Sequence, residues 1–338
     1  MNVRELGELG LIRQFRGTGP GSHAGIRVGI GDDAAVLEAT PGSLVLATTD
    51  LVVEGIHFRR EWASPRDIGW KAIAVNLSDI AAMGGIPRWA LVALAIPTAT
   101  SVEDVEALYE GMRDCATPHD VVIVGGDTSA SPDGWMINVT LLGEHAAAPR
   151  LRSMARPGDV IAVTGTLGRS AGGLAVLGAR STLRQGLEAG ATERLLSSHL
   201  RPTARVREGR WLGSQSPVHA LMDCSDGLAT DVGHLCRESG LHARIELARI
   251  PVDRAAREAA GALGEDALGW ATRGGEDYEL ILTCEADAVT AVAAGLERET
   301  GTPLTVIGTA SEGTPEITWM GFQGEVVDVR GGYEHFHG

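Results

Sequence analysis

Short runs of apolar and β-branched side chains recur through the first part of the chain, separated by glycine, proline and polar residues. Runs of this kind predict β-strands. The predicted strands are 27–37, 43–53, 88–96, 121–124 and 135–143. Two longer segments, 64–84 and 101–117, carry the signals of helices instead. Because these strands and helices do not alternate steadily, the pattern favours an α+β fold for this part of the chain.

The helix predicted at 64–84 has the clearest boundaries. Ser64 and Asp67 have the spacing of a capping box, and Gly84-Gly85 follows the last apolar residues. In its apolar centre, Asn76 and Asp79 lie three residues apart and therefore share a face. An ionised carboxylate in such surroundings is costly unless it is paired or bound to a cation. Asp79 is thus either hydrogen-bonded to a neighbouring backbone group or a metal ligand, and both interpretations stay open.

The second part of the chain follows a linker predicted at 146–150. A chain of 338 residues is long for one hydrophobic core, so we expect two domains, 1–148 and 149–338. The turn 164–168 joins a predicted strand to a predicted helix and contains two glycines. Such corners bind phosphate in some proteins. Glycines at these corners also serve the turn alone, and the sequence leaves both interpretations open.

The composition of the chain limits the functional classes to which the protein can belong. The chain has 29 Lys and Arg against 44 Asp and Glu, a net charge of −15, which argues against nucleic-acid and anionic membrane partners. Neither a signal peptide nor an apolar run of membrane-spanning length is found. The four cysteines lie far apart without a CxxC pair, which fits a reducing compartment. We therefore expect a soluble cytoplasmic protein.

Acidic residues beside glycines recur at four places in the chain. The four segments are Gly29-Ile30-Gly31-Asp32-Asp33, Gly125-Gly126-Asp127-Thr128-Ser129, Asp223-Cys224-Ser225-Asp226-Gly227 and Gly274-Gly275-Glu276-Asp277-Tyr278. A fifth oxygen-rich segment, Thr48-Thr49-Asp50, lies in a predicted strand. Carboxylates packed together repel unless a cation or proton neutralises them, and Mg²⁺ is held by a few carboxylates plus substrate phosphates. These segments predict a site for Mg²⁺ and a polyphosphate, without any P-loop or protein-kinase motif.

In this order, the segments resemble the thiamine-monophosphate kinase family. The resemblance also covers 48–58, 71–84, 199–202 (His-Leu-Arg-Pro) and the terminal Gly332-Tyr333-Glu334-His335-Phe336. It implies an aminoimidazole-ribonucleotide synthetase-like fold, with an N-terminal α+β domain whose sheet pairs in a homodimer and a C-terminal α/β domain that covers the site. The implied reaction transfers the γ-phosphate of ATP to thiamine monophosphate. Because the acceptor is an anionic phosphate, we expect direct in-line transfer without a phospho-enzyme.

The resemblance also implies roles for individual residues. The implied Mg²⁺ ligands are Asp33, Thr48, Thr49, Asp50, Asp79, Asp127, Asp223 and Asp226, of which Asp50, Asp127 and Asp226 are the expected catalytic carboxylates. The implied ATP contacts are Gly126, Asp127, Arg152, Ser225 and Tyr109, and the implied thiamine phosphate contacts are His57, Glu276 and Tyr333. A carboxylate and an aromatic face suit the cationic thiazolium. The alternative for Tyr109 is a solvent-facing helix position, and the alternative for His57 is a strand-edge histidine.

Two alternatives remain at this stage. The first is another member of the superfamily with a different acceptor. Selenophosphate synthetases use a reactive residue near the N-terminus, whereas the first cysteine here is Cys115, and hydrogenase-maturation relatives end in a functional cysteine, whereas this chain ends in Gly338. The second alternative is a catalytically silent regulator that binds nucleotide or metal. Such a regulator predicts loss of one or more acidic segments, yet all are present.

Overall fold

The computed structural model describes residues 1–7, 10, 25–179, 188–329 and 331–332. It divides into two compact units. The first comprises Met1–Ile80 and Gly85–Ala148, and the second comprises Ala81–Gly84 and Pro149–Gly338. Within the described ranges, no helix has both the length and the apolar character that crossing a membrane requires.

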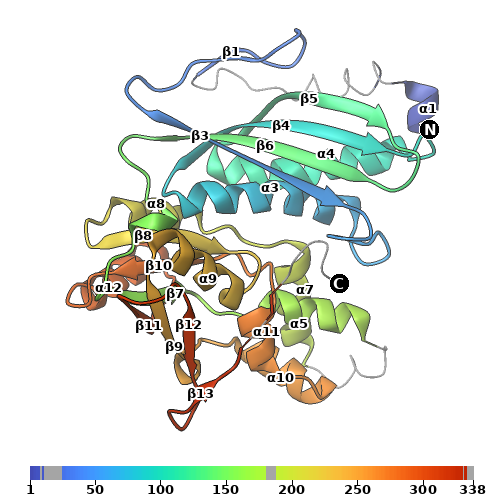
Figure 1. The fold of residues 1–338 in the computed structure, drawn as a ribbon. Helices are drawn as coiled ribbons and strands as arrows, with labels where there is room; N and C mark the ends of the chain where they lie inside the picture. The colour runs from blue at the N-terminus through green and yellow to red at the C-terminus, as the bar shows by residue number, and fades with distance from the viewer. Residues whose placement is uncertain (8–9, 11–24, 180–187, 330, 333–338) are drawn as a thin grey trace. The chain divides into compact units, whose positions relative to one another are not determined.

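A mixed four-stranded sheet forms the centre of the first unit (Figure 1). Its order is β3 (Leu44–Val53), β6 (Met136–His145), β4 (Ile86–Ile96) and β5 (Val122–Ala130), and only the β4–β5 pair is parallel. Helices α3 (Pro65–Ala82) and α4 (Val102–Ala116) lie along one side of it. The remaining elements are α1 (Val3–Leu6), β1 (Ile26–Val28), β2 (Val36–Leu37) and η1 (Thr117–His119). The α+β prediction for this part of the chain is confirmed.

The two helices of the first unit pack backbone against backbone. A Cβ atom at Gly69 of α3 would lie 1.9 Å from the carbonyl oxygen of Leu108. A Cβ atom at Gly111 of α4 would lie equally close, 1.9 Å, to the carbonyl oxygen of Arg66. The predicted capping box at the start of α3 is confirmed, because the Ser64 N–H donates to Asp67 Oδ2 at 3.0 Å and the Asp67 N–H donates to Ser64 Oγ at 3.3 Å. These contacts fix where α3 begins and how it lies against α4.

Strand β5 corrects one prediction. The sequence pattern ended this strand at Val124 and began an acidic turn at Gly125, whereas β5 continues to Ala130. Gly126 makes this possible, because it has a φ of +153° and a Cβ atom there would lie 1.8 Å from the carbonyl oxygen of Val92 in β4. The glycines therefore serve close approach of two strands rather than a turn.

The second unit contains a seven-stranded sheet of order β13-β12-β9-β11-β7-β10-β8. Its strands are β7 (Val160–Thr164), β8 (Val218–Cys224), β9 (His242–Glu246), β10 (Glu279–Cys284), β11 (Leu304–Ser311), β12 (Ile317–Met320) and β13 (Val326–Val327). All neighbouring pairs are antiparallel except β9 and β12. Its α-helices are α5 (Arg169–Gly178), α7 (Ala189–Leu200), α8 (Val206–Ser214), α9 (Leu228–Ser239), α10 (Arg254–Leu263), α11 (Ala267–Arg273) and α12 (Val289–Thr300).

Strands β8 and β10 form one end of the seven-stranded sheet, with β8 at its edge. Every residue of both strands is buried, so helices and loops cover both of their faces. Two short 3₁₀ helices, η2 (Arg152–Met154) and η3 (Leu247–Arg249), complete the unit. The arrangement of sheets and helices matches the predicted two-domain fold. The pairing of β10 with β8 brings Leu280 opposite Asp223, and this register positions the site described next.

Candidate functional site

Two acidic segments of the second unit lie side by side. Asp223, 2% exposed, is the penultimate residue of β8, and after this strand the chain turns through Ser225 and Asp226 into α9. The segment 274–278 packs against this turn, because the Glu276 N–H donates to the Ser225 carbonyl at 2.7 Å. A Cβ atom at Gly275 would lie 2.7 Å from the same carbonyl oxygen. The structure therefore brings together predicted residues that are about fifty positions apart in the chain.

The segment 274–278 has a strained backbone. Glu276 and Tyr278 have positive φ angles of 65° and 50°, which cost side-chain-bearing residues on the order of 1–3 kcal/mol each. Between them, Asp277 accepts hydrogen bonds from the N–H groups of Gly168 (2.6 Å) and Ser170 (3.1 Å) at the start of α5. Burial raises the pKa of Asp277 to about 7, against the opposing effect of these two hydrogen bonds. The N-terminus of α5 is thus bound by a carboxylate of the chain itself, so the N–H groups of Gly168 and Ser170 already have an acceptor.

Asp231 adds a third carboxylate beside Asp223 and Asp226. It is 2% exposed, and one of its oxygens accepts a hydrogen bond from the Asp226 N–H at 3.2 Å. Burial, followed by the charges of Asp223 and Asp226, raises the pKa of Asp231 to about 8. The sequence analysis missed this residue because its acidic side chain lies inside a helix rather than beside a glycine. The signal that could have identified Asp231 is its position in the first turn of the helix that follows Asp223 and Asp226.

Other predicted residues of the second unit lie around Asp226. A Cβ atom at Gly332 would lie 1.8 Å from Thr230 Oγ1 and 3.0 Å from the Asp226 carbonyl oxygen, so the C-terminal segment reaches this place. The predicted substrate residue Tyr333 is outside the described residues. Arg152 in η2 lies near His234, whose pKa is lowered mainly by burial and further by Arg237 and Arg152, while Asp226 opposes the shift.

In the first unit, the structure brings together Thr48 and Asp79. The Thr48 hydroxyl on β3 donates to a carboxylate oxygen of Asp79 on α3. Because side chains alternate along a strand, Thr48 and Asp50 share the face of β3 that meets α3. The Thr49 side chain lies on the opposite face, exposed, where its hydroxyl is 3.1 Å from that of Thr140. Side-chain oxygens of the three predicted neighbours therefore point to two different faces.

Asp50 and Asp127 lie at opposite edges of the four-stranded sheet. The register places Asp50 beside Val139, Val139 beside Val92, and Val92 beside Gly126, which precedes Asp127. Three strand spacings separate the two edges by roughly 14 Å. Since Mg²⁺ ligands lie about 2 Å from the ion, one ion does not bind both side chains within a single copy of this unit.

The remaining predicted residues of the first unit are Asp33, His57 and Tyr109. Asp33 is exposed in the loop between β1 and β2, and its N–H donates to Asp32 Oδ1 at 2.9 Å. His57 follows β3, and its Nδ1 accepts a hydrogen bond from the Val53 N–H at 3.1 Å. Tyr109 is 7% exposed, and burial raises its pKa to about 12, so the solvent-facing alternative for this residue is wrong.

The donor atoms suit Mg²⁺ by type. All eight predicted ligands carry side-chain oxygens, which are the atoms that this hard cation prefers. Across the described parts of the chain, no three His, Cys, Asp or Glu side chains are grouped in a way that could hold a metal. The assignment of these eight residues as Mg²⁺ ligands therefore stays a prediction.

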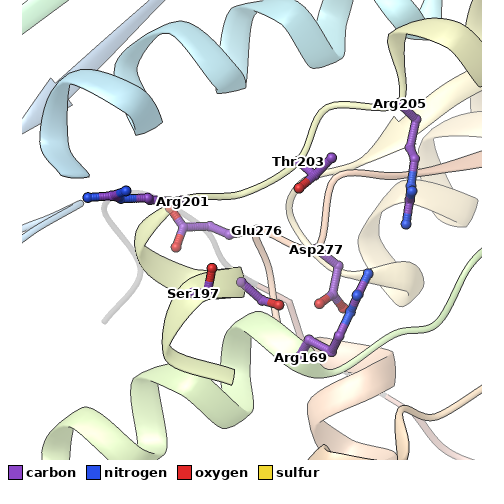
Figure 2. A pocket seen from close by; sticks show the side chains of 8 residues that line it. Arg169, Ser197, Arg201, Thr203, Arg205, Glu276 and Asp277 are labelled. Atoms are coloured by element: carbon purple, nitrogen blue, oxygen red, sulfur yellow. The ribbon is translucent and has the colours of Figure 1, made fainter. Parts of the chain in front are cut away.

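A pocket of about 140 Å³ lies beside the segment 274–278 in the second unit (Figure 2). Its lining residues are Arg169, Ser197, Ser198, Arg201, Thr203, Arg205, Glu276 and Asp277. The guanidinium groups of Arg169 and Arg205 both bind the carboxylate of Glu279, at 2.9 and 2.5 Å. The sequence analysis did not assign Arg169, Arg205 or Glu279. Their roles depend on contacts between residues more than seventy positions apart.

Models of two protein families match the chain. The N-terminal domain of AIR synthase related proteins matches residues 31–145, and the C-terminal domain of the same proteins matches residues 156–320. Together these matches cover most of both units.

The chain is also similar to named proteins and solved structures. It is 37% identical to thiamine-monophosphate kinase of Bacillus subtilis, over 93% of this chain and 95% of that protein. The structure of thiamine-monophosphate kinase from Stenotrophomonas maltophilia matches with a TM-score of 0.80 at 36% identity, over 94% of this chain and 95% of that one. A structure of AaThiL complexed with AMPPCP and TMP matches with a TM-score of 0.75 at 33% identity, over 99% of both chains.

Proposed function

We propose a reaction for this chain from the premise that it belongs to the AIR synthase related family and, within it, to the thiamine-monophosphate kinases. The chain is therefore an enzyme, a kinase that phosphorylates thiamine monophosphate with ATP. The products are thiamine diphosphate and ADP. The finer features proposed below are the residues that bind each substrate, the role of Mg²⁺ and the course of the transfer.

One observation carries the proposal, namely the convergence of segments in the second unit. Glu276 is hydrogen-bonded through its N–H to Ser225, and Gly332 packs against Asp226. The strained backbone at Glu276 is typical of residues that a binding site holds in place. Glu276 supplies a carboxylate for the cationic thiazolium ring, and Ser225 a hydroxyl for ATP.

The carboxylates provide the charge balance that phosphoryl transfer needs. The predicted ligands Asp33, Thr48, Thr49, Asp50, Asp79, Asp127, Asp223 and Asp226 would hold Mg²⁺ together with substrate phosphates. When bound, Mg²⁺ neutralises phosphate charge and aligns the transferred group. Because Asp50 and Asp127 lie on opposite sheet edges, we assign them to different ions. This agrees with the proposal of several Mg²⁺ ions.

We infer direct in-line transfer. The acceptor oxygen belongs to a phosphate that is already anionic, so the reaction needs no strong general base. The protein then mainly positions the two substrates. Arg152 and Gly126 are the further proposed ATP contacts, and His57 is a further proposed contact of thiamine monophosphate. For Tyr109, burial in α4 argues for a packing role beside any contact with the nucleotide.

We also propose that the protein acts as a homodimer in the cytoplasm. Val45 and Leu51 are exposed by 55% and 50% on the face of β3 turned away from α3. An exposed aliphatic face on a sheet suits pairing with a second copy. Light scattering coupled to size exclusion tests the dimer, and a monomer at micromolar concentration would contradict it.

The deciding experiment measures ADP release from MgATP with thiamine monophosphate, beside thiamine and aminoimidazole precursors as controls. We expect release that depends on thiamine monophosphate and falls at least about a hundredfold in Asp50→Asn and in Asp226→Asn. Asp287→Asn, an exposed carboxylate in the loop after β10, is the matched control and should keep the wild-type rate.

Other outcomes of this experiment separate the alternatives. Release with a different acceptor would indicate another superfamily member, and ATP binding without turnover on any acceptor would indicate a regulator. Labelled phosphate trapped on the protein in a chase with unlabelled ATP would contradict direct transfer.

A further inference from the structure

The His-Leu-Arg-Pro motif at 199–202 has no role in the reaction proposed above, yet its histidine contacts Glu276 in the segment 274–278. His199 lies near the end of α7 and is 7% exposed. Its Nδ1 atom lies 3.2 Å from Glu276 Oε2 and 3.0 Å from Ser170 Oγ. The imidazole therefore bridges α5 and the segment 274–278 through one ring nitrogen.

Helix packing fixes the place of this imidazole. A Cβ atom at Gly173 of α5 would lie 2.2 Å from the Leu195 carbonyl oxygen and 2.8 Å from His199 Cβ. Helices α5 and α7 thus touch through their backbones one helical turn from the imidazole. Ser170 is held as well, because its N–H donates to the Asp277 carboxylate at 3.1 Å.

The contacts of Nδ1 determine which protonation states of the His199 imidazole are compatible with the structure. An ionised carboxylate only accepts hydrogen bonds, so the contact with Glu276 requires a hydrogen on Nδ1 of His199. Both the imidazolium and the neutral ring with hydrogen on Nδ1 meet this requirement. The Ser170 hydroxyl can rotate, so it accepts a share of the same hydrogen and turns its own hydrogen elsewhere.

We propose that His199 is a positioning residue that holds the Glu276 carboxylate in the orientation used to bind the cationic substrate. The inference rests on the proposed function, in which Glu276 contacts thiamine monophosphate. The Glu276 N–H donates to the Ser225 carbonyl at 2.7 Å, and the Glu276 side chain is 26% exposed. The His199 contact orients this side chain from the buried side, and Figure 2 shows Glu276 extending toward Ser197 and Arg201, which also line the pocket.

Two amide variants test the proposal. In His199→Asn the amide nitrogen takes the position of Nδ1, whereas in His199→Gln the amide reaches the position of Nε2. Both variants are polar and neutral, so they differ mainly in which ring nitrogen they replace. His242→Gln, a partly buried histidine at the start of β9, is the control for a histidine substitution elsewhere.

The measurements are kcat, KM for thiamine monophosphate and KM for ATP, with calorimetric binding of thiamine monophosphate as an independent readout. We expect His199→Gln to raise KM and Kd for thiamine monophosphate about tenfold, the order that one hydrogen bond to a charged group contributes. KM for ATP should stay within about twofold, and His199→Asn should retain most of the wild-type affinity. In the background Glu276→Gln, the change at His199 should add little.

The outcomes distinguish failure of this inference from failure of the proposed function. Wild-type protein that neither binds nor phosphorylates thiamine monophosphate overturns the proposed function, and the inference with it. Active wild-type protein whose Asn and Gln variants at His199 behave alike overturns the inference alone. Equal losses of affinity for both substrates in His199→Gln would also overturn it, since they indicate a general packing role.

Discussion

The buried carboxylate of Glu279 supports the most quantitative prediction. Glu279 is 0% exposed and accepts hydrogen bonds from the Thr164 hydroxyl at 2.7 Å, from Arg169 at 2.9 Å and from Arg205 at 2.7 and 2.5 Å. Glu279→Gln keeps the shape of the side chain but removes the negative charge. Two guanidinium groups then lose their shared counter-charge inside the second unit.

The expected loss in the free energy of unfolding depends on the ion pairs that Arg205 and Arg169 keep in Glu279→Gln. Arg205 retains Glu208 at 3.4 Å, and Arg169 retains only a distant contact with Asp253 at 4.0 Å. Burial alone would lower the pKa of Arg205, and the attraction of Glu279 is the first of the effects that raise it instead. Breaking a buried ion pair costs about 3–5 kcal/mol. We expect about 3 kcal/mol, because part of the pairing survives.

Differential scanning calorimetry measures this effect. For a domain of the size of the second unit, a loss of about 3 kcal/mol lowers Tm by roughly 6–12 °C. The control is Glu258→Gln, which removes a pair with Arg254 whose side chains are 36% and 87% exposed, and which should lower Tm by less than about 2 °C. A Glu279→Gln transition within about 2 °C of the wild type would refute the reasoning that this carboxylate is an essential counter-charge.

Two further predictions follow from backbone geometry and from burial. In Gly126→Ala, the new Cβ atom overlaps the Val92 carbonyl oxygen at 1.8 Å, so we expect separation of β5 from β4, faster amide exchange in β5 and loss of ATP binding in a nucleotide titration. In Asp277→Asn, titration of this partly buried carboxyl is removed. Because the folded-state pKa of Asp277 is raised to about 7, the wild type loses stability from this group as pH rises toward that value. The variant should therefore gain about 3 kcal/mol relative to the wild type between about pH 5 and about pH 8 in urea unfolding, and parallel pH curves would contradict the buried charge.

Local signals in the sequence were enough for the boundaries of several elements. The start of α3 depends on Ser64 and Asp67, three residues apart, and the structure contains the contact between them. The apolar and β-branched content of residues 43–53 likewise predicted a strand to Val53, where β3 ends. Capping and strand propensity depend on neighbours in the chain, so they can be recognised without knowledge of the tertiary fold.

For the candidate site, the sequence and the tertiary structure supplied different information. The sequence by itself identified the acidic segments and, through resemblance, the family to which they belong. Only the tertiary structure decided that Glu276 packs against Ser225, that Asp50 and Asp127 occupy opposite sheet edges, and that a carboxylate fills the α5 terminus. The physical reason is that strand order and register bring together residues many positions apart. Each local segment is compatible with several such arrangements, and the packing of the whole unit selects one.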